Sequence, residues 1–333
     1  MKARRVFAAM ALVLTACSTT PQGAPIRVIV PKGATFRAAT DSLHNAGLVG
    51  STLFFRLYAR VKGADRNIKP GTYLLKRGTP WADIVSALNG GRGLVNTITI
   101  PEGFTIARIT PLLAKALSIP VDSVNVAVRD TILLQRLSVP TPTLEGYLFP
   151  DTYAFPDGTT ARAAVFEMVR RFEREWKPEW NARLPQLSLD RHGLVTLASI
   201  VEREAKVAPE RPVIAAVYLN RLRAKMPLQA DPTVQYARGT HTTRLLHKDL
   251  EIDSPYNTYR YPGLPPGPIA SPGGASLVAA LFPADVPYLY FVAMPDGHHE
   301  FRRTLAEHEV AVRTARAAAA RAAAQQKAAT GTR

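Results

Sequence analysis

One segment, residues 194–205, constrains the fold more than any other part of the chain. Its sequence, LVTLASIVEREA, places its apolar residues on one broad stripe when successive residues turn by about 100° around a helix axis. Glu204 falls inside this stripe, whereas Glu202 lies about 200° away from it, on the far margin. The segment therefore predicts a helix that buries one face in a core and carries a carboxyl group into that face.

A carboxyl group on a buried face has two interpretations. Burial raises the pKa of a carboxyl group, and one that stays protonated near neutral pH can serve as a general acid. Alternatively, the group lies at the rim of the core and pairs with an arginine, because ion-pair networks also perturb acids. We take Glu204 as the candidate catalytic acid and expect an orienting or structural role for Glu202.

The bulk properties indicate an exported or surface-binding globular protein. The 333 residues allow two domains, and 47% hydrophobic with 20% charged residues describes a folded chain. The formal net charge is +16, and removing the three basic residues of a predicted leader gives 16 − 3 = +13. A basic surface suits nucleic acid, anionic lipid headgroups or an anionic cell-wall polymer.

Residues 1–17 have the pattern of a lipoprotein-type signal peptide. Lys2, Arg4 and Arg5 precede an apolar run of 11 residues, Val6–Ala16, which is shorter than the about 20 residues that span a bilayer. The run ends in Leu-Thr-Ala-Cys, and Cys17 is the only cysteine. We therefore predict lipid attachment at Cys17, with ordinary secretion and an uncleaved short anchor as alternatives. Export argues against nucleic acid as a partner.

The chain then alternates strands and helices. A polar linker is expected at 18–25, and a small α+β module at 26–92. Thr79 is the predicted N-cap of the module's last helix, with Pro80 at its first helical position. The module's predicted strands are 26–30 and 71–75, and its predicted helices are 35–46, 53–61 and 80–88.

A larger domain is expected at 93–310, followed by an Ala/Arg-rich tail at 311–333 that is either a solvated helix or disordered. Asp231-Pro232 and Ser271-Pro272 each combine an N-cap residue with a proline in the first turn. Thr105 is a further predicted cap. The predicted elements are a strand at 96–100, helices at 105–117, 160–180, 194–205 and 212–225, and a buried strand at 288–293; the predicted core includes Leu197, Val201, Val217 and Phe291.

Several motifs follow the candidate catalytic helix in a fixed order. They are RPVIAAVYLNRL at 211–222, MPLQADPTVQY at 226–236, YNTY at 256–259, GLPPGPIASPG at 263–273, YLYFVA at 288–293 and DGHHEF at 296–301. In this order and spacing, the chain resembles the endolytic murein transglycosylase family, also described as YceG-like, over about residues 26–310. Because several unusual motifs occur together, the resemblance is specific, whereas a single Glu-x-Glu would mean little.

The resemblance implies a fold and an activity. The implied fold class is α+β, with a small LysM-like module followed by a larger mixed α/β YceG-like catalytic domain; a plain spacer is the alternative for the small module. The implied enzyme is a lytic transglycosylase, a lyase that cuts the MurNAc–GlcNAc bond inside peptidoglycan strands, leaves a 1,6-anhydro-MurNAc end and terminates nascent strands. No cofactor and no metal are expected. The expected partners are peptidoglycan glycan strands, a membrane through the N-terminus and glycan-synthesising penicillin-binding proteins.

Lytic chemistry suits a site with one convincing acid. Ordinary glycoside hydrolysis needs two carboxylates, and only Glu204 is well placed in the sequence. If the 6-hydroxyl of muramic acid is the nucleophile, one glutamate can protonate the leaving oxygen and then accept the hydroxyl proton. Neutral polar groups that orient the sugar are useful around such a site. The assisting candidates are Glu202, Glu145, Asn220, Gln229, Asp231, Tyr256, Asn257 and Tyr259.

Each assisting candidate also has a structural interpretation. The amides and tyrosines can fasten loops, and Asp231 can cap a helix whatever else it does. The aromatic segment 144–153 is either a loop at the edge of the core or a wall on which sugars stack. The resemblance favours the wall, with Glu145 facing the cleft.

Other functional classes fit the sequence less well. A non-catalytic peptidoglycan-binding lipoprotein would not need a desolvated acid, and a hydrolytic muramidase would need a second carboxylate. A metal site built from His298, His299, Glu300 and His308 is disfavoured, since adjacent histidines point in opposite directions in a strand. A pyridoxal-phosphate enzyme is excluded for want of a lysine in a phosphate-binding context. We expect an exported protein anchored to the inner membrane, or to the outer membrane if lipidated, and facing the cell wall.

Overall fold

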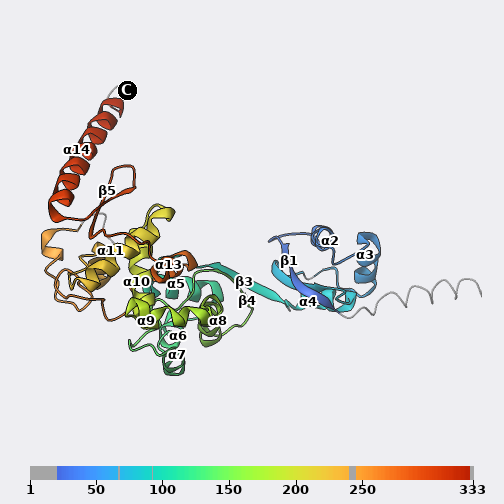
Figure 1. Ribbon diagram of the computed structural model, residues 1–333. Helices are drawn as coiled ribbons and strands as arrows, with labels where there is room; N and C mark the ends of the chain where they lie inside the picture. The colour runs from blue at the N-terminus through green and yellow to red at the C-terminus, as the bar shows by residue number, and fades with distance from the viewer. Residues whose placement is uncertain (1–20, 67, 92, 240–244, 331–333) are drawn as a thin grey trace, which may run out of the picture. The chain divides into compact units, whose positions relative to one another are not determined.

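The computed structural model describes residues 21–66, 68–91, 93–239 and 245–330, which form two compact units (Figure 1). Unit 1 comprises the residues up to Ile98 together with Thr152–Thr160, and unit 2 comprises Thr99–Asp151 and the residues from Ala161 onward. The predicted leader and Cys17 lie outside the described residues. Within the described part of the chain, every helix is too short or too polar to cross a membrane.

Unit 1 is built on a four-stranded sheet in the order β1-β2-β3-β4. Strand β1 pairs antiparallel with β2, so that Val28 lies opposite Tyr73, and β2 pairs antiparallel with β3. The strands are β1 (Gln22–Val30), β2 (Gly71–Arg77), β3 (Leu94–Thr99) and β4 (Thr152–Pro156), and the helices are α2 (Phe36–Asn45), α3 (Thr52–Val61) and α4 (Trp81–Gly90).

Unit 1 has its own hydrophobic core between this sheet and its helices. Phe55 of α3 is fully buried, with its ring stacked on Phe36 and in edge contact with Trp81. Tyr73 is also fully buried, and its hydroxyl donates to the carbonyl oxygen of Lys69. A buried tyrosine needs such a partner for its hydroxyl group, so β2 and the chain that precedes it are fixed together.

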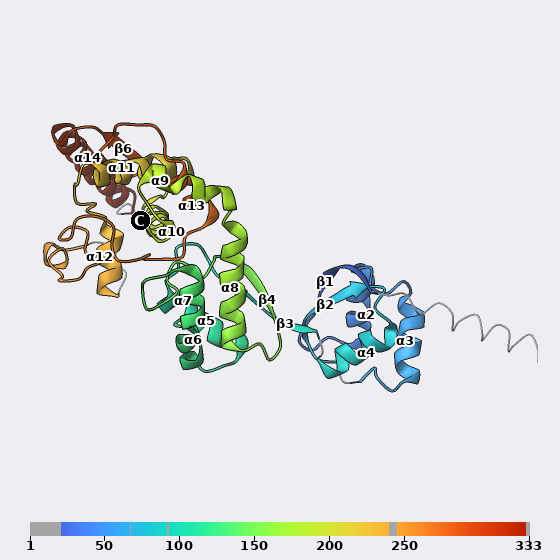
Figure 2. The same ribbon diagram turned by 60° about the horizontal axis from the view of Figure 1, so that its bottom comes forward.

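Unit 2 is mostly helical and contains one two-stranded sheet (Figure 2). Helices α5, α6 and α8 pack on one another, and α10 packs against α11, α12 and α13. Its main elements are α5 (Ile106–Leu117), α6 (Val121–Ala127), α7 (Thr131–Leu137), α8 (Ala161–Glu175), α9 (Leu184–Leu187), α10 (Arg191–Glu204), α11 (Arg211–Arg223), α12 (Asp231–Arg238), α13 (Gly274–Leu281), β5 (Tyr290–Ala293), β6 (His299–Arg302) and α14 (Leu305–Thr330). The expected mixture of helices and strands is confirmed.

Most of the predicted core of unit 2 is confirmed. Leu197, Val201 and Val217 are fully buried. The prediction for Phe291 and for a buried strand at 288–293 is wrong, because β5 pairs only with β6 and stays partly exposed. The sequence predicts a tail that is either a solvated helix or disordered. The described part of it is helical, but α14 packs against β5 and β6 and buries Ala311 and Ala315, so it is not solvated on all sides.

Thr105 holds the predicted N-cap position of α5, whereas the predictions of Thr79, Asp231 and Ser271 as N-caps are wrong. Helix α4 begins after Pro80, and the Thr79 hydroxyl donates to the carbonyl oxygen of Lys76. Asp231 is the first residue inside α12 rather than its N-cap. The N-cap residue is Ala230 in α12 and Gly273, rather than Ser271, in α13. In α5 it is Thr105, whose side chain makes no capping hydrogen bond.

The predicted division of the chain at 92/93 stays a prediction. Contacts place β3 up to Ile98 in unit 1 and return Thr152–Thr160 to the same unit. The reason is that β4 pairs beside β3, so the sheet draws together two segments that are far apart in the sequence.

Candidate active site

The helix that carries the candidate acid runs through the core of unit 2. Helix α10 begins where the side chain of Asp190 accepts a hydrogen bond of 2.6 Å from the backbone of Gly193. Every residue from Leu194 to Val201 is buried. Because the backbone turns to an extended conformation at Ala205, Glu204 is the last helical residue and remains partly exposed at the carboxyl end of the helix.

Glu204 is held by one strong hydrogen bond in a poorly solvated position. The hydroxyl group of Tyr218 donates to its Oε1 atom at 2.8 Å. Burial raises the pKa of Glu204 to about 7; Asp231 also raises it, whereas the hydrogen bond from Tyr218 and the nearby charges of Arg203 and Lys206 lower it. A carboxyl group that titrates near neutral pH can give and take a proton in turn.

Tyr218 is a site residue that the sequence analysis missed, although it lies in the motif at 211–222. It projects from α11, is 1% exposed and meets Phe291 edge-on. Burial raises the pKa of Tyr218 well above its ordinary value, so the phenol stays a hydrogen-bond donor. The signal was a tyrosine inside the apolar run 213–219, since a buried hydroxyl group needs a partner.

Asp231 and Tyr259 form a second polar pair near Glu204. The hydroxyl group of Tyr259 donates to Oδ1 of Asp231 at 2.6 Å. Burial raises the pKa of Tyr259, and both Asp231 and Glu204 raise it further. The exposed Gln229 has a left-handed backbone with φ of 50°, and its backbone N–H donates to Thr258. These bonds hold the segments 226–231 and 256–259 together beside the candidate acid.

The carboxyl group of Glu202 connects α10 to the amino terminus of α13. Its Oε2 atom accepts from the backbone N–H of Gly273 at 3.1 Å and from the hydroxyl of Ser276 at 2.7 Å. Its other oxygen lies 3.8 Å from the guanidinium of Arg211. Because α13 has no side-chain cap of its own, Glu202 of α10 supplies the acceptor for that helix's amino terminus.

The side-chain amides of Asn220 and Asn257 donate hydrogen bonds to backbone carbonyl oxygens within the fold. The Asn220 side chain donates to the carbonyl oxygens of Val286 and Tyr288, at 2.8 and 3.0 Å. The Asn257 side chain donates to two carbonyl oxygens of the segment 250–252 and is fully buried. These contacts favour the interpretation of both residues as loop fasteners.

Glu145 makes its hydrogen bonds with Ile106 and Tyr236, not with the residues that contact Glu204. Both of its carboxyl oxygens lie within 3.1 Å of the backbone nitrogen of Ile106, where α5 begins, and Tyr236 donates to Oε2 at 3.3 Å. Tyr256 packs against Tyr236, with ring centroids 4.8 Å apart. Glu145 also lines a cavity of about 590 Å³ whose other residues include Arg108, Arg129 and Arg203. The structure thus places Glu145 on a basic cavity.

Burial raises the pKa of Glu145 to about 8, despite the hydrogen bonds that favour its charged form. A folded-state pKa above the unfolded value means that the folded chain binds the proton more tightly. This contribution to stability is present in full below about pH 4.5 and is lost as the pH rises towards 8. Between pH 5.5 and 7.5, Glu145 should therefore lower the free energy of unfolding of the wild-type protein by up to about 1.4 kcal/mol for each pH unit. Glutamine is neutral at every pH, so Glu145→Gln should lack this part of the pH dependence.

Urea unfolding at the two pH values measures this difference. The exposed Glu251 is the matched position, and Glu251→Gln should keep the pH dependence of the wild-type protein. An unchanged pH dependence in Glu145→Gln would show that Glu145 is ionised in the folded protein.

The segment 263–273 is fastened along α10 by two residues that the sequence analysis also missed. The hydroxyl of Ser199 accepts from the backbone N–H of Ile269 at 3.0 Å. The ring of His192 bonds the carbonyl oxygen of Pro266 through Nε2 and the hydroxyl of Tyr147 through Nδ1, both at 2.9 Å. Polar residues on a helix that is buried all round are the available sequence signal, because they need partners in the core.

The histidine-rich segment forms pairs rather than a cluster. His299 bonds Glu210 through Nδ1 at 2.7 Å, and His298 bonds Asp296. The ring of His308 stacks on Tyr290. In the part of the chain that the structure describes, no three His, Cys, Asp or Glu side chains are grouped as metal ligands.

Comparisons with known proteins identify a family and several relatives of this chain. The model of the YceG-like family matches residues 28–314. An endolytic murein transglycosylase from Bacillus subtilis is 36% identical over 301 residues, which cover 86% of this chain and 83% of the relative. One from Streptococcus pneumoniae is 29% identical, and the match spans 58% of its length. A crystal structure of a YceG-like protein from Listeria monocytogenes has a TM-score of 0.62 at 32% identity, covering 86% of this chain and 98% of that one.

Proposed function

The chain belongs to the YceG-like family, and on that premise we propose that it is a lytic transglycosylase that cuts peptidoglycan glycan strands at internal MurNAc–GlcNAc bonds. The observation that carries the proposal is the environment of Glu204. Its carboxyl group is poorly solvated, has a pKa of about 7 and is oriented by Tyr218. A protein that only binds the wall has no need of such an acid.

The first step of the proposed reaction uses the protonated form of Glu204. The carboxyl group gives its proton to the glycosidic oxygen, and the bond from that oxygen to the anomeric carbon of MurNAc breaks. Positive charge then develops on the sugar ring. Oriented hydroxyl groups can stabilise this charge, and Tyr259, together with the carboxylate of Asp231 that it contacts, is the candidate for that role.

The second step regenerates the enzyme. The 6-hydroxyl of the same MurNAc attacks its anomeric carbon, a new carbon–oxygen bond closes the 1,6-anhydro ring, and the hydroxyl proton passes to the Glu204 carboxylate. Because the nucleophile belongs to the sugar, it is already close to the reacting carbon. Tyr218 keeps the receiving oxygens of Glu204 in place between the two steps.

A hydrolytic muramidase is the second candidate, and Asp231 favours it. This exposed carboxylate acts on the pKa of Glu204 and is therefore near it. Two neighbouring carboxyl groups are the usual equipment of a glycoside hydrolase. The two candidates share Glu204 as the acid and differ in whether water or the MurNAc hydroxyl attacks.

The endolytic part of the proposal is tested by the lengths of the glycan strands. Purified protein is incubated with peptidoglycan, and the strands are released with an amidase and sized by chromatography at early times. Internal cutting should lower the mean strand length before disaccharides accumulate. Early release of disaccharides from intact long strands would indicate cutting from the ends instead.

The cellular setting completes the proposal. We place the protein outside the cytoplasm, held to a membrane by a lipid on Cys17, where it would terminate strands made by glycan-synthesising penicillin-binding proteins. The mass of the mature N-terminal peptide tests the lipid. Unit 1 is proposed to be a LysM-like module, and its compact sheet and helices with a separate core are compatible with that role.

A further inference from the structure

The outer face of α3 in unit 1 exposes an unusual amount of apolar surface. Four large side chains on this ten-residue helix, those of Leu53, Phe54, Leu57 and Val61, are 57–77% exposed. Their spacing places them on one side of the helix, while Phe55 enters the core from the other. Contiguous apolar surface of this kind marks an interaction site in a soluble protein.

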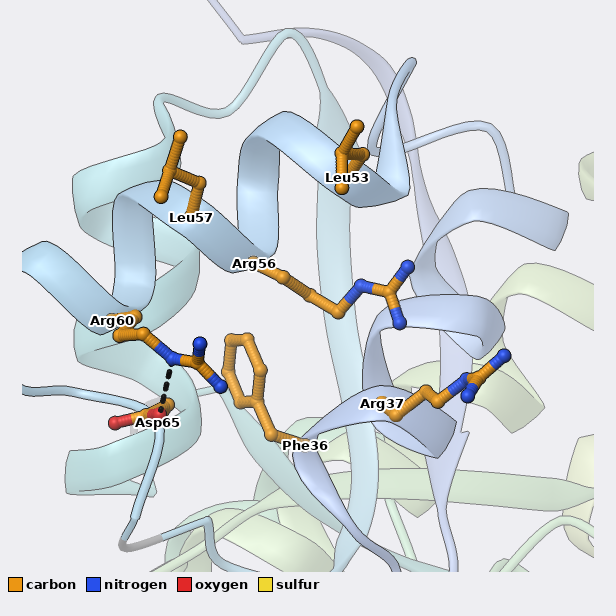
Figure 3. A pocket seen from close by; sticks show the side chains of 7 residues that line it. All are labelled: Phe36, Arg37, Leu53, Arg56, Leu57, Arg60 and Asp65. Atoms are coloured by element: carbon orange, nitrogen blue, oxygen red, sulfur yellow. Dashed lines mark ion pairs between the residues drawn. The ribbon is translucent and has the colours of Figure 1, made fainter.

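Arginine side chains border this apolar face. Arg56 and Arg60 of α3 and Arg37 of α2 line a cavity of about 480 Å³ that also contains Phe36 (Figure 3). Figure 3 shows Leu53 and Leu57 projecting from one side of α3, and Arg56 and Arg60 extending from the other side, with Arg60 beside the ring of Phe36. One acid, Asp65, also lines the cavity, and it lies 3.8 Å from the mostly exposed Arg60. Three arginines against one carboxylate leave the cavity positively charged.

The chemistry of this surface fits an anionic lipid bilayer better than a sugar. The hydroxyl and amide groups of sugar rings are recognised by converging amide and hydroxyl groups, whereas the polar side chains that line this cavity are all charged. The one aromatic ring in the cavity, that of Phe36, is stacked on Phe55. A helix with apolar residues on one side and basic residues beside them is the arrangement that lies in the interface of a membrane.

We infer that the α3 face, defined as Leu53, Phe54, Leu57 and Val61 with Arg37 and Arg56, rests on an anionic phospholipid surface. The apolar side chains enter the boundary between headgroups and acyl chains, and the arginines contact lipid phosphates. This role is independent of the proposed reaction at Glu204, because it involves only unit 1.

The proposed lipid on Cys17 would make this contact effective. Only four residues lie between Cys17 and Gln22 at the start of β1, so the five residue steps span at most about 18 Å. A single acyl chain gives marginal membrane binding, and stable attachment takes a second signal. The α3 face would supply that second signal and fix which side of unit 1 faces the bilayer.

The test uses the chain from residue 18 to 333, which lacks the leader and keeps every described residue. Its partition onto vesicles of phosphatidylcholine alone, or with about a third phosphatidylglycerol, is measured by co-sedimentation at low and high salt. We expect binding that requires the anionic lipid and weakens with salt. Each arginine near the surface contributes about 1 kcal/mol, or about fivefold, so Arg37→Glu with Arg56→Glu should lower the partition at least about 25-fold.

A matched apolar variant controls for general stickiness. Leu57→Ser with Phe54→Ser should also lose vesicle binding, whereas Val126→Ser, at a somewhat more exposed apolar position on α6, should keep it. All variants should keep their thermal unfolding temperature and their cleavage of solubilised peptidoglycan. If the wild-type protein failed to cleave peptidoglycan, the proposed function would be wrong, but the inference about the α3 face would be unaffected.

Two outcomes overturn the inference. The first is equal partition onto both kinds of vesicle, or partition that the α3 variants leave unchanged. The second is loss of binding to purified glycan strands in the α3 variants while vesicle binding persists, which would make this face a glycan site.

Discussion

Glu204→Gln is expected to leave the protein folded and to abolish glycan cleavage. Glutamine is nearly isosteric and keeps a carbonyl oxygen for the hydroxyl of Tyr218, so the free energy of unfolding should change little. It cannot give or take the proton that both steps of the reaction need. Removal of a general acid or base lowers the rate by about 10²–10⁴-fold, and the upper end applies here because one group serves twice. Release of soluble fragments from peptidoglycan measures the loss.

Glu202→Gln, two residues away on the same helix, is the matched control. Its carboxylate bonds the backbone of Gly273 and the hydroxyl of Ser276, so the substitution weakens the attachment of α13 to α10. We expect a loss of about 1–2 kcal/mol in the free energy of unfolding, with most of the cleavage activity retained. If Glu202→Gln destroyed cleavage and Glu204→Gln spared it, the acid would be Glu202.

Gly146→Ala should be the most destabilising small substitution near the site. Gly146 follows Glu145 and has a φ of 85°, which costs a residue with a side chain about 1–2 kcal/mol. An added Cβ would also lie 2.4 Å from Cβ of Pro268 and 3.2 Å from Cγ1 of Val195. Such overpacking adds about 1–3 kcal/mol, so we expect a total loss of about 2–5 kcal/mol by urea unfolding.

The same conformation occurs without the crowding at Gly263. Its φ is 90°, and a Cβ there would meet nothing within 4 Å. Gly263→Ala should therefore lose only the backbone contribution of about 1–2 kcal/mol. Equal losses in the two variants would show that the segment around Pro268 yields to the added atom and does not press on Gly146.

Helix α10 could be predicted because its apolar stripe is long and continuous. Helix α10 lies at 191–204 against a prediction of 194–205, and the burial of Leu197 and Val201 follows directly from the stripe. The prediction that Glu204 lies on the buried side and Glu202 has a structural role is consistent with the contacts of both. Their roles in the reaction stay predictions.

Residues whose role depends on distant partners could not be predicted. Nothing near Tyr218 in the sequence indicates that it meets Glu204, and the two residues join only because α10 packs against α11. The predicted side-chain caps failed for the same reason: a cap pattern is local, whereas Glu145 and Glu202 reach helix ends from 39 and 71 residues away. Phe291 was misplaced because an apolar run does not reveal how many strands its sheet contains.

The attacking group in the cleavage reaction is the most direct test of the account. Peptidoglycan is digested in water enriched in heavy oxygen, and the new MurNAc ends are analysed by mass spectrometry. We predict 1,6-anhydro ends, which are one water lighter than hydrolysis products and free of the label, and we predict that Glu204→Gln forms none of them. Labelled reducing ends that also depend on Glu204 would contradict the account, because water, activated by a second carboxylate such as Asp231, would then be the nucleophile.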